Sequence, residues 1–159
     1  MALSYSTGLV HNMLNTTANG GKTFGEAFNN GVVLIYGGTR ASNADGAVGS
    51  APLLGMATLN GGAFTPGNAT NGLQFGTAAN RTIDKSSSQV WQFTGLATGT
   101  ATWFRIVGNA SDNGLASTSL PRLDGTIAPF GGDITLRDPS IVLDNVYTIN
   151  QALLTWPAL

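Results

Sequence analysis

The chain has 159 residues, of which 42% are hydrophobic and only 9% are charged, and its formal net charge is −1. This length suits one domain, and abundant apolar residues with few charges exclude an intrinsically disordered chain. The seven lysines and arginines stand singly, which argues against nucleic-acid binding, and the absence of cysteine excludes disulfides and thiolate metal sites. The start has no basic, apolar leader, and no apolar run reaches the about 18 residues of a membrane span, so we expect a protein made in the cytoplasm.

Residues 1–30 are expected to form a helical arm at the N-terminus. Apolar residues recur at helical spacing between residues 6 and 15, which predicts a short amphipathic helix. Thr23 and Glu26 then have the spacing of a capping box, in which each side chain satisfies a free amide of the first helical turn. A second short helix is therefore expected to begin at Thr23.

Residues 31–159 are expected to complete this single domain as an all-β, antiparallel β-sandwich of jelly-roll-like form. Seven to nine short strands alternate with Gly, Asn and Pro turns, and no long helices separate them. The predicted strands are 32–36, 53–59, 63–65, 73–75, both arms of a hairpin over 90–107, 120–127, 133–136 and 146–149, with a tail at 153–157 that extends the last. Pro121 lacks a backbone donor, which favours an edge position for residues 120–127.

The segment Val90–Val107 is the strongest strand signal in the chain. Both arms are rich in aromatic and β-branched residues, and Gly95 and Gly99 lie between them, which predicts a β-hairpin. On the second arm large side chains fall on both faces, because successive residues alternate across a strand. We expect this strand inside a sandwich, or at the boundary between the core and a partner subunit.

No group of residues predicts catalysis. His11 is the only histidine, and it falls on the polar side of the first predicted helix, so no Ser-His-Asp triad is indicated. The loop Asn109–Gly114 has oxygen ligands at a density that could hold calcium, but it lacks the closing glutamate of an EF-hand and also reads as a plain Asx-rich turn. We therefore expect no enzyme, no cofactor and no metal site.

Arg105 follows two aromatic residues on the second arm of the predicted hairpin. Its guanidinium can reach Asp124 or another acid, while its aliphatic stem covers an aromatic ring. Two interpretations stay open, namely an ordinary ion pair at the rim and an anchor in a protein interface, since Trp and Arg are enriched in interface hot spots.

The chain resembles small virion proteins encoded among the head and tail genes of tailed bacteriophages. The matching stretches, which span most of the chain, are Leu3–Leu9, Gly31-Val32 with Tyr36–Thr39, Asn71–Phe75, Gly99–Arg105 and Arg122–Thr126. This resemblance implies a structural component of a virus particle with no enzymatic residues. It does not distinguish the head from the tail.

We expect a capsid decoration or cement protein in the virion that binds between capsomers of the major capsid protein, as a homo-oligomer with a trimer favoured. The alternatives are a tail, baseplate or connector subunit, and a carbohydrate- or receptor-binding module with an exposed aromatic platform. The residues expected at the interface are Leu3, Leu9, Met13, Trp91, Trp103, Phe104 and Arg105.

Overall fold

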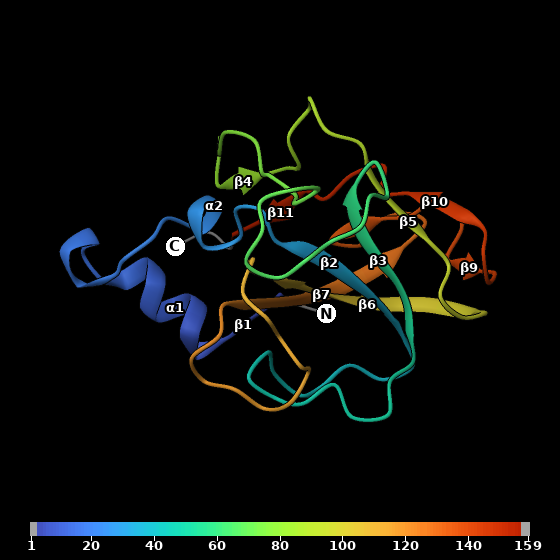
Figure 1. Cartoon of the computed structure of the whole chain (residues 1–159), viewed down its shortest axis with the longest axis horizontal. Helices are drawn as coiled ribbons and strands as arrows, with labels where there is room; N and C mark the ends of the chain where they lie inside the picture. The colour runs from blue at the N-terminus through green and yellow to red at the C-terminus, as the bar shows by residue number, and fades with distance from the viewer. Residues whose placement is uncertain (1–2, 157–159) are drawn as a thin grey trace.

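The computed structural model describes residues 3–156, and strands dominate it (Figure 1). The N-terminal elements are β1 (Ser4–Tyr5), α1 (Thr7–Leu14), the 3-10 helix η1 (Thr17–Asn19) and α2 (Phe24–Ala27). The strands that follow are β2 (Val32–Gly37), β3 (Leu53–Leu59), β4 (Thr82–Ile83), β5 (Trp91–Thr94), β6 (Gly99–Val107), β7 (Arg122–Ala128), β8 (Ile134–Thr135), β9 (Ser140–Ile141), β10 (Val146–Thr148) and β11 (Leu154–Thr155).

Nine of the described strands belong to one sheet with the order β1-β7-β6-β2-β3-β5-β10, in which β8 also pairs with β7 and β9 with β6. All these pairs are antiparallel except β7 with β8. Strands β4 and β11 form a separate antiparallel ribbon. The prediction of an all-β, mostly antiparallel fold is therefore confirmed.

Strand β2 is buried along its whole length, because it lies between β3 and β6 and both faces of the sheet are covered. Val33 and Ile35 point into the main hydrophobic core. Val32, Leu34 and Tyr36 point to the opposite face and belong to a second apolar cluster. Residues alternate across a strand, so a continuous apolar run is what a strand between two covered faces requires.

The described part of the first 30 residues packs into the same core as the sheet. Strand β1 pairs with β7, and the side chains of Leu9 on α1 and Phe28 after α2 are buried in the main core. The helices that were predicted here exist, over Thr7–Leu14 and Phe24–Ala27. The predicted arm is thus anchored in the core on both sides, while residues 15–23 between the two helices are mostly exposed.

Two long loops cover the second face of the sheet, residues 38–52 between β2 and β3 and residues 108–121 between β6 and β7. Figure 1 shows them side by side below the sheet. The Val48 amide donates to the Gly114 carbonyl, and the Ser117 amide donates to the Asp45 carbonyl. Asp45 also accepts hydrogen bonds from the amide and hydroxyl of Thr7 at 2.8 and 2.6 Å, which ties this layer to α1.

The predicted hairpin over residues 90–107 is wrong, although both of its arms are strands. Strand β5 pairs with β3 and β10, whereas β6 pairs with β2, β7 and β9, so two strands separate β5 from β6. The Phe93 ring of β5 packs directly on the backbone of Gly55 in the neighbouring β3, and the Leu96 amide donates to the Leu54 carbonyl. The first arm and the residues after it are therefore held by β3 and not by β6.

Three smaller predictions also fail. Residues 63–65 form no strand, because the turn after Asn60 is fixed by the Asn71 side chain, whose amide donates to the Ala63 carbonyl. Residues 73–75 make only isolated bridges. Strand β7 has partners on both sides, β6 and β1, so it is not at an edge. Of the predicted tail, Leu154–Thr155 form β11 with β4, and Pro157 lies outside the described residues.

Replacing Gly55 by Ala tests the packing of Phe93 on β3. A Cβ there would lie 2.1 Å from the Phe93 ring, so G55A is expected to lower the free energy of unfolding by about 1–3 kcal/mol. Gly25 in α2 is the matched control, since nothing lies within 4 Å of its Cβ position. Urea unfolding of both variants checks this, and an unchanged stability of G55A would contradict the packing of Phe93 on Gly55.

Candidate functional site

The pair of Arg105 on β6 and Asp124 on β7 lies inside the protein. The two residues face each other across the strands, with Nε to Oδ1 at 2.7 Å and Nη2 to Oδ2 at 2.8 Å, and both side chains have zero exposure. Burial lowers the pKa of Arg105, but the hydrogen bonds and charge of Asp124 outweigh this and raise its pKa overall. The predicted contact with Asp124 is confirmed, while a position at the rim is wrong.

A second ion pair joins Arg122 of β7 to Asp112 in the loop 108–121. Nε and Nη2 of Arg122 donate to the two carboxylate oxygens of Asp112 at 2.6 Å each, and the side chains are 0% and 4% exposed. Asp112 also accepts from the Gly114 amide, and Asn113 from the Leu115 amide, which is the geometry of an Asx-rich turn. The Asp112 carboxylate is thus used to bind Arg122. Residues 3–156 contain no group of three or more His, Cys, Asp or Glu side chains that could hold a metal ion.

Most of the residues predicted at an interface are buried within this chain. Trp91, Trp103, Phe104, Arg105 and Leu9 are at most 2% exposed. Their side chains pack in the core or between the sheet and its covering loops, so the folded chain does not present them to a partner. The prediction that these five form the interface is wrong for that reason.

Leu3 and Met13, the other two residues predicted at the interface, are half-buried and pack against the main core. His11 is exposed on α1, where its carbonyl accepts from the Asn15 amide, and its imidazole makes no hydrogen bond or ion pair within residues 3–156. In the same part of the chain no helix is long and apolar enough to cross a membrane. Of Leu3, Met13 and His11, only Met13 lines the apolar pocket that is described below.

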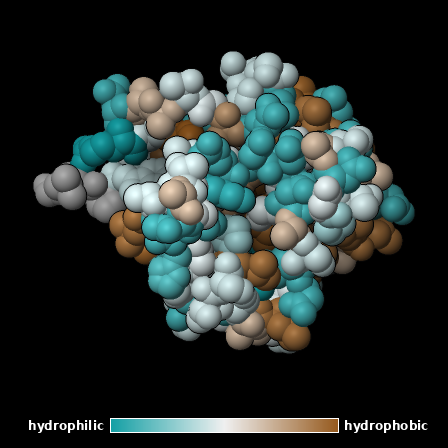
Figure 2. All heavy atoms as spheres, turned by 60° about the vertical axis from the view of Figure 1, so that its left-hand side comes forward, coloured by the Kyte–Doolittle hydropathy of each residue, from teal (hydrophilic) through white to brown (hydrophobic). Residues whose placement is uncertain are grey.

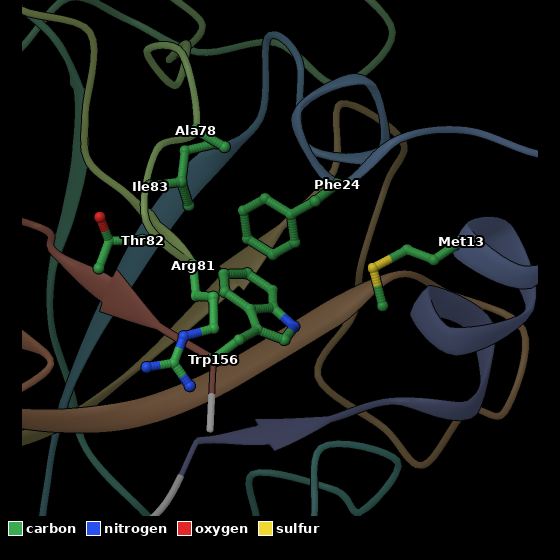
Figure 3. A pocket seen from close by; sticks show the side chains of 7 residues that line it. All are labelled: Met13, Phe24, Ala78, Arg81, Thr82, Ile83 and Trp156. Atoms are coloured by element: carbon green, nitrogen blue, oxygen red, sulfur yellow. The ribbon is translucent and has the colours of Figure 1, made fainter. Parts of the chain in front are cut away.

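An apolar pocket of about 360 Å³ opens between the helices and the β4–β11 ribbon. Figure 3 shows its side chains converging from α1, from α2, from the hairpin that leads into β4 and from the residue after β11. They are Met13, Phe24, Ala78, Arg81, Thr82, Ile83 and Trp156. Arg81 is the charged member, and the walls present carbon atoms to the cavity.

The pocket lies at the surface end of a continuous run of aromatic rings. Trp156 meets Phe24 with ring centroids 4.9 Å apart at 86°, and Phe24 meets Phe75 at 5.2 Å and 66°. Phe75 in turn meets the buried Trp91 at 5.2 Å and 85°. These edge-to-face contacts are a favoured aromatic geometry and connect the pocket wall to the core.

The capping box of α2 places Phe24 in this wall. The Thr23 hydroxyl accepts from the Glu26 amide at 3.3 Å, and the Glu26 carboxylate accepts from the Thr23 amide at 2.8 Å. The predicted capping box is therefore confirmed. The hydrogen bond from the Thr23 backbone lowers the pKa of the Glu26 carboxyl.

Arg81 occupies an unusual backbone position beside the pocket. Ala79 and Thr82 exchange both backbone hydrogen bonds at 2.9 and 2.8 Å, so Asn80 and Arg81 are the two central residues of a tight hairpin turn. Their φ angles are +50° and +63°, as a type I′ turn requires. Arginine stands where this turn favours glycine, and its side chain is exposed at the pocket.

A cluster of exposed apolar side chains lies at another corner of the sheet. It consists of Leu96, Val142, Leu143 and Val146, which are between 46% and 61% exposed. Leu96 lies in the link between β5 and β6, Val142 and Leu143 lie in the loop after β9, and Val146 begins β10. The two loops adjoin, because the Asp144 amide donates to the Gly95 carbonyl and the Leu143 amide donates to Thr98 Oγ1. We call this cluster the apolar corner. On the face turned toward α1, by contrast, Figure 2 shows hydrophobic side chains as separate patches among polar ones.

Sequence reasoning missed both the pocket and the apolar corner. Asn80-Arg81 lacks the glycine of the usual hairpin signal, and the pocket joins residues between positions 13 and 156 that only the fold brings together. Comparisons with protein-family models, with curated proteins and with solved structures found no match. The interpretation of function therefore depends on the chain itself.

Asp124→Asn tests the buried pair. The substitution leaves the Arg105 guanidinium buried opposite a neutral group, so we expect the free energy of unfolding to fall by about 3–5 kcal/mol. Asp144→Asn is the control, because Asp144 is exposed. The double substitution R105M/D124L should recover much of the loss in urea unfolding, and a D124N variant as stable as wild type would contradict the pairing.

The lowered pKa of Glu26 gives a pH prediction for the first turn of α2. The cap contributes stability above the ordinary glutamate pKa and loses it as the pH falls through the lower pKa of the folded state. In an NMR titration the Thr23 amide should therefore shift with a midpoint below the ordinary glutamate value. The shift should vanish in E26Q, and a midpoint at or above the ordinary value would contradict the hydrogen bond.

Proposed function

We propose that this chain is a structural subunit of a bacteriophage virion, and specifically a capsid decoration protein that binds between capsomers on the head. The observation that carries the proposal is the apolar corner, a group of large apolar side chains exposed on a chain with little charge. Single exposed apolar residues are normal, but a cluster on adjoining loops is typical of protein–protein contact. The proposal includes synthesis in the host cytoplasm and a homo-oligomer, with a trimer favoured.

The placement of charge supports a binding role. Of seven basic and eight acidic residues, Arg105, Arg122, Asp112 and Asp124 are paired within the protein. The surface is left with few charges, which weakens electrostatic repulsion between neighbouring subunits. In a shell of many copies, modest apolar contacts add up to stable attachment through avidity.

We also propose that the fold is a jelly-roll-like sandwich, in which the sheet folds over into two layers. The main core supports this, because it contains Phe93 of β5 and Leu123 of β7, which lie toward opposite ends of the sheet. Strands β5 and β10 would form the smaller layer and carry the apolar corner at their end.

The alternatives differ in what they require of the surface. A tail, baseplate or connector subunit would use the same apolar contacts in fewer copies per particle. A carbohydrate-binding module needs an exposed aromatic platform, whereas Trp91 and Trp103 are buried and Trp156 is partly exposed. The sugar-binding alternative would thus have to use the pocket around Trp156 or the exposed ring of Phe130.

The proposal is tested by attachment to purified virus particles. Mass spectrometry should find the chain at about one copy per several major capsid subunits, whereas a handful of copies per particle would assign it to the tail. Its absence from particles would contradict both assignments. The double variant L96D/L143D should keep the wild-type circular dichroism spectrum but lose at least tenfold in particle occupancy, because charges at an apolar contact lose their hydration.

Leu115→Asp is the matched control for the apolar corner. Leu115 is 62% exposed but lies in the loop 108–121, away from the four residues of the corner. If L115D occupies particles as fully as wild type and L96D/L143D does not, the contact lies at the apolar corner. If both variants occupy particles equally, the choice of this surface is overturned.

A further inference from the structure

We infer that the apolar pocket binds an aliphatic carboxylate of medium chain length, with its hydrocarbon chain against Phe24 and Trp156 and its carboxylate at Arg81. This inference does not rest on the proposed virion function. It comes from three features of the pocket, which are its size, its preformed aromatic wall and the single cation at its edge.

The size of the pocket selects the class of ligand. A volume of about 360 Å³ lies within the range of small-molecule sites, and it is more than twice the roughly 150 Å³ cavity that holds one benzene. A chain of about ten carbons is comparable to that volume. The pocket is open on one side, so a polar head can stay in water while the chain is buried.

The wall of the pocket is held in place before any ligand arrives. Phe24 is fixed by the capping box of its helix and by edge-to-face contacts with Trp156, Phe28 and Phe75. The Trp156 amide donates to the Arg81 carbonyl at 2.9 Å, which fastens the residue after β11 to the turn. A preformed site loses less conformational entropy on binding. Met13, the flexible member of the wall, can adjust to chains of different shape.

Arg81 supplies the charge complementarity. It makes no ion pair within residues 3–156, and no other residue of the pocket wall is charged. Its φ of +63° is unfavourable for a residue other than glycine, so the turn alone does not account for an arginine here. A guanidinium beside a carbon-lined pocket matches a ligand that joins a hydrocarbon chain to a carboxylate.

Quenching of tryptophan fluorescence by a brominated decanoate tests the inference on the intact protein. Trp91 and Trp103 are buried, whereas Trp156 lines the pocket, so contact quenching should report on Trp156. We expect saturable quenching below the micelle concentration that is lost in W156F. Acetate should not compete, and decanoate should compete better than decanol.

Two variants distinguish the contribution of the ligand's hydrocarbon chain to binding from that of its carboxylate. Ala78→Phe fills the pocket from an exposed position and should weaken decanoate binding at least tenfold. Arg81→Gln should weaken decanoate about two- to fivefold, the size of an exposed ion pair, and leave decanol unchanged. Arg137→Gln, an exposed arginine outside this pocket, is the matched control.

Each outcome of these measurements bears on the inference. Saturable binding that A78F and R81Q weaken, with R137Q unchanged, supports it. Absence of saturable quenching overturns it, and so does binding that A78F leaves intact. Equal affinity of wild type and R81Q for decanoate overturns the assignment of the carboxylate to Arg81. None of these results changes the expected occupancy of virus particles.

Discussion

The buried pair of Arg105 and Asp124 is the constraint on which the layers of this protein depend. Two charges on adjacent strands with no exposure must be desolvated together, and they are tolerated only with good geometry and a dry surrounding. The sheet face that holds them therefore needs a cover. The loops 38–52 and 108–121 provide that cover, and Asp112 in the second loop pairs with Nε and Nη2 of Arg122 at the same time.

The cover is joined to the N-terminal segment by a compact set of hydrogen bonds. Ser6 caps α1 by accepting from the Leu9 amide, and its hydroxyl also donates to the Leu120 carbonyl and accepts from the Arg122 amide. Asp45 in the other loop binds Thr7. Helix α1, β7 and both covering loops thus meet beside the buried charges.

The sequence allowed the local elements to be predicted better than their partners. The capping box of Thr23 and Glu26 and the apolar run of β2 depend on neighbouring residues, and both were found correctly. The segment Val90–Val107 was correctly identified as two strands, but its first arm pairs with β3, about 30 residues earlier in the chain. Local β-propensity contains no information on that contact.

The candidate site was harder to predict for the same reason. Large aromatic residues next to an arginine are equally typical of an interface and of a core. In the structure Trp103 and Arg105 are buried, so here the pattern belongs to the interior of the chain. The pocket requires Met13 and Trp156 to come together through the β4–β11 ribbon. The signal that was present, Asn80 at the first position of a two-residue turn, was weakened by the arginine that follows.

The distribution of charge connects the fold to the two proposals. Four of the few charged side chains are used inside the protein, so the remaining ones are sparse, and Arg81 is the one charged residue of the pocket wall among residues 3–156. Within these residues no acid forms an ion pair with Arg81, so its charge can act on what binds beside it. The apolar corner lacks such a charge and suits a protein surface, whereas the pocket combines a cation with a carbon wall and suits a small amphiphile. The two sites should therefore respond to different substitutions, L96D/L143D at the corner and R81Q at the pocket.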